Sequence, residues 1–271
     1  MVDTTKEICE AVCEIARSVG TFMLNERKNF STDKIETKGT NDFVSYVDKK
    51  SEELIVEQLL PLVNNAGFLT EEGTVVQSQN SKYTWVIDPL DGTTNYIHGL
   101  SPYAVSIALT EDGIPIVGVV YIVPTDECFY AWRGGKAYLN GSEIKSSPVA
   151  SVADALMITG FPYKIGEKVN NYMEAMKHLT FHSHGVRRLG SAAADLAFVA
   201  CGRAEVFYQT DLNPWDVAAG VLIARQAGAV VTDFTGGDNY IYGNHSVLAT
   251  GNSDLSKQMI ELLSKFFPNC E

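Results

Sequence analysis

The stretch Asp88-Pro89-Leu90-Asp91-Gly92-Thr93-Thr94-Asn95 sets two aspartates and two threonines around a proline and a glycine. Residues 83–87, just before it, are rich in aromatic and β-branched residues and predict a strand. The proline and glycine predict that this strand ends in a turn, and the threonines are typical first residues of a short helix. Carboxylates beside a turn suit a hard cation such as Mg²⁺, and backbone N–H groups at a helix start suit an anion. The stretch therefore predicts a phosphoryl-transfer site.

Two further segments extend this pattern. Glu71-Glu72 is a second acidic pair, and Trp215-Asp216-Val217-Ala218-Ala219-Gly220 lies nearer the C-terminus. Together with the first stretch they resemble the signatures of the inositol monophosphatase family, whose members are Mg²⁺-dependent, lithium-sensitive phosphatases. The resemblance covers roughly residues 5–255. Other residues that fall in family order with similar spacing are Lys38, Asp42, Asp48 and Gly190-Ser191-Ala192-Ala193.

The resemblance implies two or three Mg²⁺ ions. Glu71, Asp88 and the backbone carbonyl of Leu90 would hold the first ion. Asp88, Asp91 and Asp216 would hold the second, so that Asp88 bridges the two. Asp48 resembles the family's outer acid for a third, weaker ion.

Each of these acids also has a structural interpretation. Asp88 and Asp91 are of a type that is common in turns. Asp216 can cap the helix that it opens. Asp48, on a helix rich in Lys and Glu, can be a surface charge, and Glu72 is either a partner of the metal ligands or a solvated acid.

The resemblance also implies catalytic roles for Glu71, Thr93 and Asp91. Thr93 would hold the attacking water with its hydroxyl, Glu71 would accept the proton of that water, and Asp91 would help to steady the leaving group. Thr93 can alternatively be an ordinary N-cap. The substrate-binding residues implied by the resemblance are Asp91, Gly92, Thr93, Gly190, Ser191, Ala192, Gln209 and Asp216.

Position 209 departs from the family pattern, because inositol-selective members carry Glu where this chain has Gln209. We therefore expect a Mg²⁺-dependent phosphate monoester hydrolase, an inositol-1-monophosphatase with activity on other sugar and polyol phosphates. Fructose-1,6-bisphosphatase, 3'(2'),5'-bisphosphate nucleotidase and NADP phosphatase use the same kind of site and are alternatives. A regulatory scaffold that uses the fold without catalysis is a further alternative of another class.

Bulk composition limits the classes of partner. The chain has 271 residues and a formal net charge of −12, which argues against nucleic acid or an anionic membrane as the main partner. There is no run of 18 apolar residues that could span a membrane and no apolar leader. The five cysteines show no metal or redox spacing, which is typical of a reduced cytoplasmic protein. We expect a small phosphate monoester as partner and, from the resemblance, a homodimer.

Hydrophobic periodicity organises the chain into two halves. Apolar residues recur at helical spacing over 4–27 and predict a helix. Further predicted helices are 46–60, 167–179, 191–200, 214–227 and 254–266. Predicted strands are 67–70, 83–87, 103–110, 115–123, 127–133, 155–159, 182–186, 204–208, 229–233 and 247–250. Asp112-Gly113 predicts a hairpin between two of them.

This order predicts an α+β fold in two closely packed lobes. Residues 1–147 would form an α+β lobe that carries the metal and phosphate sites, and residues 148–271 an α/β lobe on the substrate side. The resemblance implies a layered αβαβα sandwich of the inositol monophosphatase and fructose-1,6-bisphosphatase type. Asp216 lies so far along the chain from Asp91 that the two can share a site only at the interface of the lobes.

Overall fold

The computed structural model describes residues 4–28, 35–39, 42–78, 81–161, 167–243 and 246–268, with side chains for all of these except 35–39, 42–45 and 167–168. The side chains of Lys38 and Asp42, and Cys270 as a whole, lie outside the described part. The helices are α1 (Thr4–Lys28), α2 (Tyr46–Leu59), α3 (Thr93–His98), α4 (Glu167–His182), α5 (Ala192–Ala200), α6 (Pro214–Gln226) and α7 (Ser253–Phe266).

Two main sheets contain most of the strands. A seven-stranded sheet has the order β3-β4-β5-β6-β7-β8-β9, and a five-stranded sheet has the order β11-β10-β12-β14-β13. The strands of the first are β3 (Gly67–Thr70), β4 (Tyr83–Asp91), β5 (Ala104–Glu111), β6 (Ile114–Ile122), β7 (Glu127–Trp132), β8 (Ala137–Leu139) and β9 (Ser142–Glu143). Those of the second are β10 (Met157–Thr159), β11 (Val186–Arg187), β12 (Val206–Gln209), β13 (Val230–Thr232) and β14 (Val247–Thr250). A separate small ribbon pairs β1 (Ile35–Gly39) with β2 (Asp42–Ser45).

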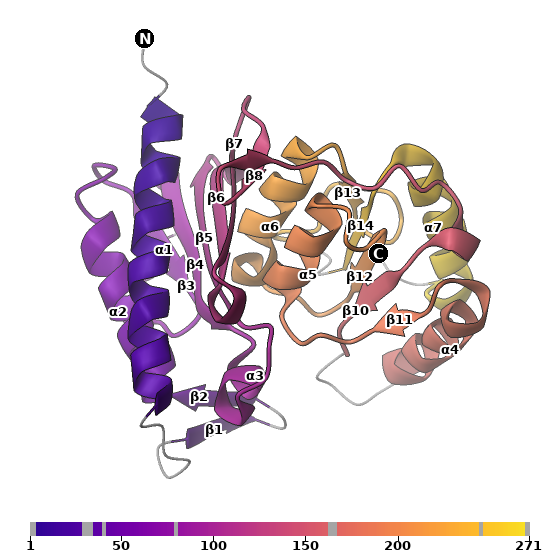
Figure 1. Cartoon of the computed structure of the whole chain (residues 1–271), viewed down its shortest axis with the longest axis horizontal. Helices are drawn as coiled ribbons and strands as arrows, with labels where there is room; N and C mark the ends of the chain where they lie inside the picture. Colours follow the sequence, from indigo (N-terminus) through magenta and orange to yellow (C-terminus); the bar gives the residue numbers. More distant parts are fainter. Residues whose placement is uncertain are drawn as a thin grey trace.

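These elements form five layers (Figure 1). Helices α1 and α2 cover one face of the seven-stranded sheet, and α5 and α6 lie between that sheet and the five-stranded one. Helices α4 and α7 cover the outer face of the second sheet. The predicted α+β class and αβαβα sandwich are confirmed. The two sheets are built from residues 67–143 and 157–250. The boundary between residues 147 and 148, at which we propose to divide the two lobes, lies between these ranges.

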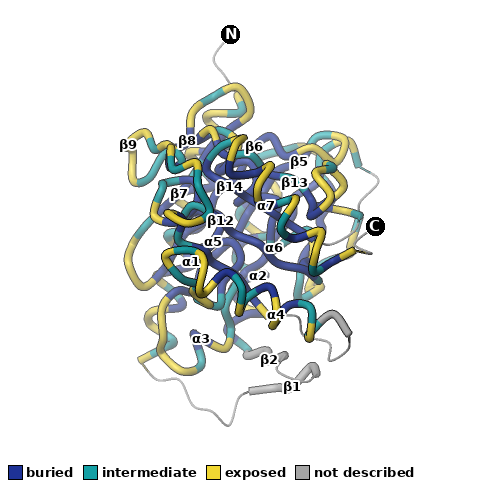
Figure 2. The backbone as a smooth tube through the Cα atoms, turned by 90° about the vertical axis from the view of Figure 1, so that its right-hand side faces the viewer, coloured by how far each residue is buried: buried dark blue, intermediate teal, exposed yellow. Residues whose placement is uncertain are grey.

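Three apolar cores follow from this layering. The apolar residues that recur at helical spacing in α1 include Val12, Ile15 and Val19, and all three are buried against the large sheet. The central core holds α5 and α6, which are almost wholly buried between the sheets (Figure 2). A third core lies between the small sheet and α4 with α7. Each fully buried aliphatic side chain stabilises the fold by about 1.5–3 kcal/mol, so the layers are held mainly by these cores.

Two predicted strand boundaries are wrong. Strand β4 does not end at Ile87 but continues through Pro89 to Asp91, and its register with β5 shifts between Asp88 and Asp91. An irregular register accommodates a proline, which has no N–H to give to a sheet. The predicted strand 182–186 is also wrong at its start, because His182 lies in the last turn of α4 and its ring stacks on that of His178 at 4.2 Å between centroids.

The other predicted helices and strands are found with small shifts at their ends. The Asp112-Gly113 hairpin joins β5 and β6, and both residues have positive φ angles, 50° and 79°. The short strands β1, β2, β8 and β9 were not predicted. No helix within the described ranges has the length and apolar content needed to cross a membrane.

Candidate active site

The carboxyl ends of three neighbouring parallel strands form one wall of the candidate site. Strands β11, β10 and β12 lie side by side and run parallel. Gln209 is the last residue of β12, while Phe161 and Arg188 lie in the segments that follow β10 and β11. The guanidinium of Arg188 lies 5.8 Å from the centre of the Phe161 ring. Ligands of open α/β sheets bind outside the carboxyl ends of the strands. Gln209, one of the predicted substrate-binding residues, therefore lies at the edge of the sheet where ligands commonly bind.

The turn after β4 forms the opposite wall. The carboxylate of Asp88, only 1 % exposed, accepts a hydrogen bond on Oδ1 from the Leu90 N–H at 2.9 Å. Gly92 is the N-cap of α3 and has a φ of 96°. A Cβ at this position would lie 3.1 Å from the carbonyl oxygen of Gly190, so the backbones of the two lobes meet here. Glycine suits Gly92 because it combines a left-handed conformation with this close approach.

Three hydrogen-bonded links hold the lobes together around this turn. Asp91 Oδ2 accepts from Ser191 Oγ and from the Ala193 N–H, both at 2.7 Å. Asn95 donates through Nδ2 to the carbonyl of Leu189 at 2.8 Å. Ser106, which pairs with Asp88 across β4 and β5, donates to the carbonyl of Trp215 at 3.2 Å. The second link uses the last residue of the Asp88–Asn95 stretch, and the third brings the Trp215-Asp216 segment to Asp88.

Four of the predicted acidic ligands interact electrostatically at this junction. Burial, followed by the charges of Glu71, Asp91 and Asp216, raises the pKa of Asp88 well above its usual range. Burial outweighs the hydrogen bonds from Ser191 and Ala193 and raises the pKa of Asp91 to about 6. The pKa of Asp216 rises to about 7 because of burial and the charge of Asp91. A cation placed among these groups would favour their charged forms and reverse these shifts.

Asp216 caps a helix and also interacts with another acid of the junction. Its Oδ2 accepts from the Asn213 N–H at 2.7 Å and completes a capping box at the start of α6. The helix also lies close against β6, since a Cβ at Gly118 would be 2.7 Å from the Ala219 carbonyl oxygen. The hydrogen bond of the cap therefore fixes the Asp216 carboxylate, which also interacts electrostatically with Asp91.

The donor chemistry fits a hard cation. The predicted ligand set consists of carboxylates and the Leu90 carbonyl, with no imidazole or thiolate. Within the described residues no three His, Cys, Asp or Glu side chains already form a cage that could hold an ion. The hydrogen bonds above use one oxygen each of Asp88, Asp91 and Asp216. Mg²⁺ suits such a site, because it takes only one or two carboxylates from the protein and keeps several waters.

Thr93 and Asp48 form a pair beside the carboxylates. Thr93 Oγ lies 2.9 Å from Asp48 Oδ1 and 3.1 Å from the Leu90 carbonyl oxygen. Asp48 is 1 % exposed, so its interpretation as a surface charge is wrong. Thr93 is the first residue of α3 rather than its N-cap, a position that Gly92 occupies.

The substrate-side residues lie where the small sheet meets α5. Ala192 is the first residue of α5 and follows the N-cap Ser191. Gln209 ends β12 and is 6 % exposed. Its side chain lies directly against Gly160, where a Cβ would be 2.1 Å from Gln209 Oε1.

Sequence reasoning missed several residues that organise this site. Ala193 supplies an amide to Asp91, and Asn95 and Ser106 link the lobes. Glu52 accepts hydrogen bonds from the segment around Glu71-Glu72. Ala193 and Asn95 lie inside the quoted motifs, although no role was assigned to them, and Glu52 lies one helical turn after Asp48 on a predicted helix. Ser106 left no signal in the sequence.

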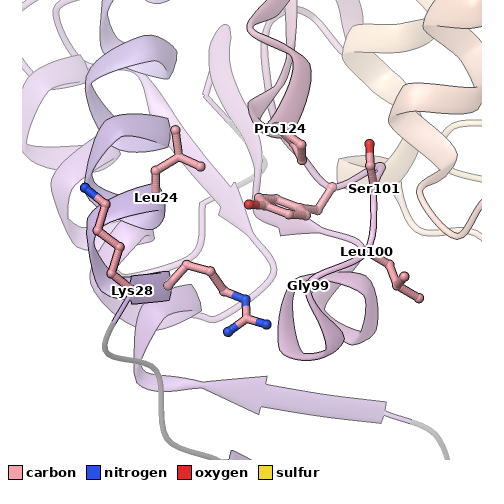
Figure 3. Close-up of a pocket in the computed structure, with 8 residues that line it drawn as sticks. Leu24, Lys28, Gly99, Leu100, Ser101 and Pro124 are labelled. Atoms are coloured by element: carbon pink, nitrogen blue, oxygen red, sulfur yellow. The ribbon is translucent and has the colours of Figure 1, made fainter.

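A cavity of about 400 Å³ lies elsewhere, at the far end of α3 (Figure 3). Its lining residues are Leu24, Arg27, Lys28, Gly99, Leu100, Ser101, Tyr103 and Pro124. None of the predicted site residues is among them. The candidate active site is therefore the lobe junction rather than this cavity.

Known proteins share this chain's sequence and fold. The model of the inositol monophosphatase family matches residues 4–266. An inositol-1-monophosphatase of Mesorhizobium japonicum is 38% identical over 231 residues, which cover 85% of this chain and 86% of that protein. The Nus factor SuhB of Escherichia coli K12 is 40% identical over 248 residues, or 90% of this chain and 91% of that one.

Solved structures agree with these relatives. The extragenic suppressor protein suhB of Bartonella henselae superposes with a TM-score of 0.86 at 34% identity, covering 94% of this chain and 98% of that one. The inositol monophosphatase of Anabaena superposes with a TM-score of 0.84 at 33% identity and covers 96% of both chains.

Proposed function

This chain belongs to the inositol monophosphatase family, and we propose that it is a Mg²⁺-dependent phosphate monoester hydrolase that acts on inositol 1-phosphate and on related polyol and sugar phosphates. Membership of the family supports phosphatase chemistry. The observation that carries the proposal is the mutual interaction of Glu71, Asp88, Asp91 and Asp216, which come from both lobes. Carboxylates that are buried or half-buried and repel one another suit a cation and a phosphate ester better than a plain structural junction.

We assign the metal to Glu71, Asp88, Asp91, Asp216 and the Leu90 carbonyl, with Asp48 near a third position. Bound Mg²⁺ lowers the pKa of water and neutralises charge on the phosphate oxygens. Two or three ions are proposed. Lithium is expected to inhibit at submaximal Mg²⁺ concentrations by competing for the second position.

Glu71 and Thr93 are proposed to prepare the attacking water. A threonine hydroxyl has one proton to donate and two lone pairs that accept. The Thr93 proton is directed to Asp48 or to the Leu90 carbonyl. The hydroxyl is then left to accept a hydrogen bond from the water, while Glu71 accepts the proton that the water loses. Asp48 thereby fixes the orientation of Thr93.

The substrate is proposed to lie between the Gly92–Thr93 turn and the start of α5. Backbone N–H groups of the turn would contact the phosphate. Ser191, Ala192 and Gln209 would contact the alcohol part of the ester, and Gly190 allows the close approach of the two backbones.

Gln209→Glu is expected to shift specificity toward inositol monophosphate and away from bisphosphates. A carboxylate accepts stronger hydrogen bonds from substrate hydroxyls than an amide does and repels a second phosphate. A difference of about 1 kcal/mol per bond corresponds to roughly five-fold in discrimination. The measurement is kcat/KM for inositol 1-phosphate and fructose 1,6-bisphosphate in both proteins. Gln226→Glu, the same change at the far end of α6, is the control; an unchanged ratio in Gln209→Glu would remove residue 209 from the substrate site.

A panel of phosphate-release assays with Mg²⁺ tests the proposed function. Inositol 1-phosphate and polyol phosphates are expected to be hydrolysed faster than a 3'(2'),5'-bisphosphate nucleotide, NADP or fructose 1,6-bisphosphate. A clear preference for one of these three would assign the chain to that alternative phosphatase. Failure to hydrolyse any ester would favour a scaffold role, an option kept open by relatives named Nus factor SuhB.

The setting of the enzyme is part of the same proposal. We assign it to the cytoplasm, as a homodimer whose partner molecules are small phosphate esters rather than nucleic acid or membrane. The net charge of −12 supports this choice of partners. Light scattering during size-exclusion chromatography tests the dimer directly.

A further inference from the structure

A buried glutamate on α2 contacts the segment that carries Glu71. Glu52 is completely buried. Its Oε1 accepts hydrogen bonds from Thr70 Oγ at 2.9 Å, from the Thr74 N–H at 2.7 Å and from Thr74 Oγ at 2.7 Å. Its Oε2 accepts from the Glu72 N–H at 2.8 Å. Both oxygens of one carboxylate are therefore engaged by residues 70–74.

These contacts enclose Glu71 from both sides. Thr70 precedes it and Glu72 follows it, and each is bonded to Glu52. The Glu71 N–H itself donates to the Ile87 carbonyl at 3.2 Å, one residue before Asp88. The backbone of Glu71 is thus fixed on both sides, and its side chain lies near enough to Asp88 for the two carboxylates to interact electrostatically.

The same face of α2 also supports Thr93. Asp48 and Glu52 lie four residues apart, hence on one face of the helix, and both are buried. Asp48 accepts from Thr93, while Glu52 holds the segment of Glu71. One helix face therefore contacts Thr93 directly and holds Glu71 through the residues on either side of it.

A buried carboxylate such as Glu52 is not needed if its role is only to hold residues 70–74 against α2. Burying a charge is unfavourable unless hydrogen bonds replace water, and all four bonds of Glu52 come from neutral donors of the loop. A charged acceptor fixes such donors more tightly than a neutral one. Hydrogen-bonded groups around a metal site commonly serve to orient the metal ligands.

We propose that Glu52 is a positioning residue that sets the geometry of Glu71 as a metal ligand and proton acceptor. This inference rests on the proposed function, because it assigns Glu71 a task. Substitution of such orienting groups typically lowers metal affinity or activity by about 10–100-fold. Both oxygens of Glu52 accept from residues 70–74, so we assign it no direct contact with substrate or metal.

The test compares Glu52→Gln with Glu53→Gln. In Glu52→Gln the side chain keeps one oxygen that can accept, but its NH₂ group replaces the other oxygen and faces a donor of residues 70–74, so that hydrogen bond is lost. The neighbouring Glu53 is exposed and pairs with Lys50 at 2.8 Å, so its variant makes the same charge change on the outer side of the helix. For Glu52→Gln we expect a 10–100-fold loss of kcat, a several-fold rise in the Mg²⁺ concentration for half-maximal activity and a less than two-fold change in KM. Glu53→Gln should remain within two-fold of the parent in all three.

Mg²⁺ binding by calorimetry, and the rise in Tm that Mg²⁺ causes, give a readout independent of turnover. If the parent hydrolyses no ester but binds Mg²⁺ and Glu52→Gln binds it more weakly, the proposed reaction fails and the positioning role stands. A folded Glu52→Gln with the parent's Mg²⁺ affinity and kcat would overturn the inference. If Glu52→Gln does not fold, Thr74→Ala, which removes one of the four bonds, decides: a weaker shift in the same direction supports the role, and no shift in Mg²⁺ affinity overturns it.

Discussion

The Asp91→Asn variant is expected to lose at least about a thousandfold in turnover while it remains folded. The change keeps the size of the side chain and an oxygen that can accept from Ser191 and Ala193, each 2.7 Å from Asp91 in the parent. It removes the charge that the second metal position requires. Metal ions supply several kcal/mol of charge stabilisation in the transition state, and a thousandfold corresponds to about 4 kcal/mol. Phosphate release at saturating Mg²⁺ measures the loss.

Although Asp91→Asn should lose activity, its metal-free form should be at least as stable as the metal-free parent. The pKa of Asp91 is about 6 in the folded chain, against a usual value of 3.8. The folded form therefore binds more protons than the unfolded form between these values, so the metal-free parent loses stability as pH rises from about 4 to about 6 and stays lower above that. Asparagine cannot ionise, so metal-free Asp91→Asn should be at least as stable as the metal-free parent at pH 8, as thermal unfolding in EDTA will show.

Asp112→Asn is the matched control for both measurements. Asp112 is also a turn aspartate, with a φ of 50° that asparagine tolerates, at the opposite end of β5 from the partner of Asp91. Its variant should keep the parent's activity. If Asp91→Asn retained most of its turnover, Asp91 would have only the structural role of joining the lobes.

Asp216→Asn is expected to lower turnover by at least about a hundredfold with a small effect on stability. Asparagine retains an oxygen that can accept from the Asn213 N–H, which lies 2.7 Å from the parent carboxylate. The helix cap is therefore largely preserved, and loss of a cap altogether costs only about 0.5–2 kcal/mol. Loss of a charged metal ligand removes several kcal/mol of transition-state stabilisation.

The two interpretations of Asp216 differ in what they change. A cap residue would change Tm and leave kcat of the folded enzyme intact, whereas a metal ligand would change kcat and Mg²⁺ activation. Asp254→Asn is the control, because Asp254 lies in the first turn of α7, is exposed and pairs with Lys257 at 3.3 Å. If Asp216→Asn had a lower Tm but a normal kcat, Asp216 would act only as a helix cap and not as a metal ligand.

Much of the fold could be predicted because its long helices and strands have regular patterns. The helix over 4–27 and the strand over 67–70 were found within a residue of their observed limits. The errors have local causes. Helix α4 continues beyond the predicted end at residue 179 to His182, whose ring stacks on that of His178. The register shift of β4 carries the strand past Pro89. Strands as short as β8 and β9 contain too few residues to show an alternation.

Asp88, Asp91 and Asp216 could be named because the Asp88–Asn95 and Trp215–Gly220 motifs carry them, and Glu71 and Asp48 because they fall in the order and spacing of the resembled family. The links that gather these residues could not be predicted, since they join distant parts of the chain. Asn95 and Leu189 are 94 positions apart, and Ser106 and Trp215 are 109 apart. Neither pair has a local pattern. The role of Glu52 also depends on where the segment after β3 passes over α2, which only the packed structure reveals.

Phosphate release from inositol 1-phosphate, followed in excess EDTA and again after Mg²⁺ is added beyond the chelator, tests the central claim most directly. The carboxylates of both lobes are expected to be inactive without a cation, because several uncompensated negative charges would then face the phosphate. We predict no turnover in EDTA and full recovery with Mg²⁺, saturating as the sites fill. Turnover that continues unchanged in excess EDTA would contradict the assignment of Glu71, Asp88, Asp91 and Asp216 as a metal-dependent catalytic centre.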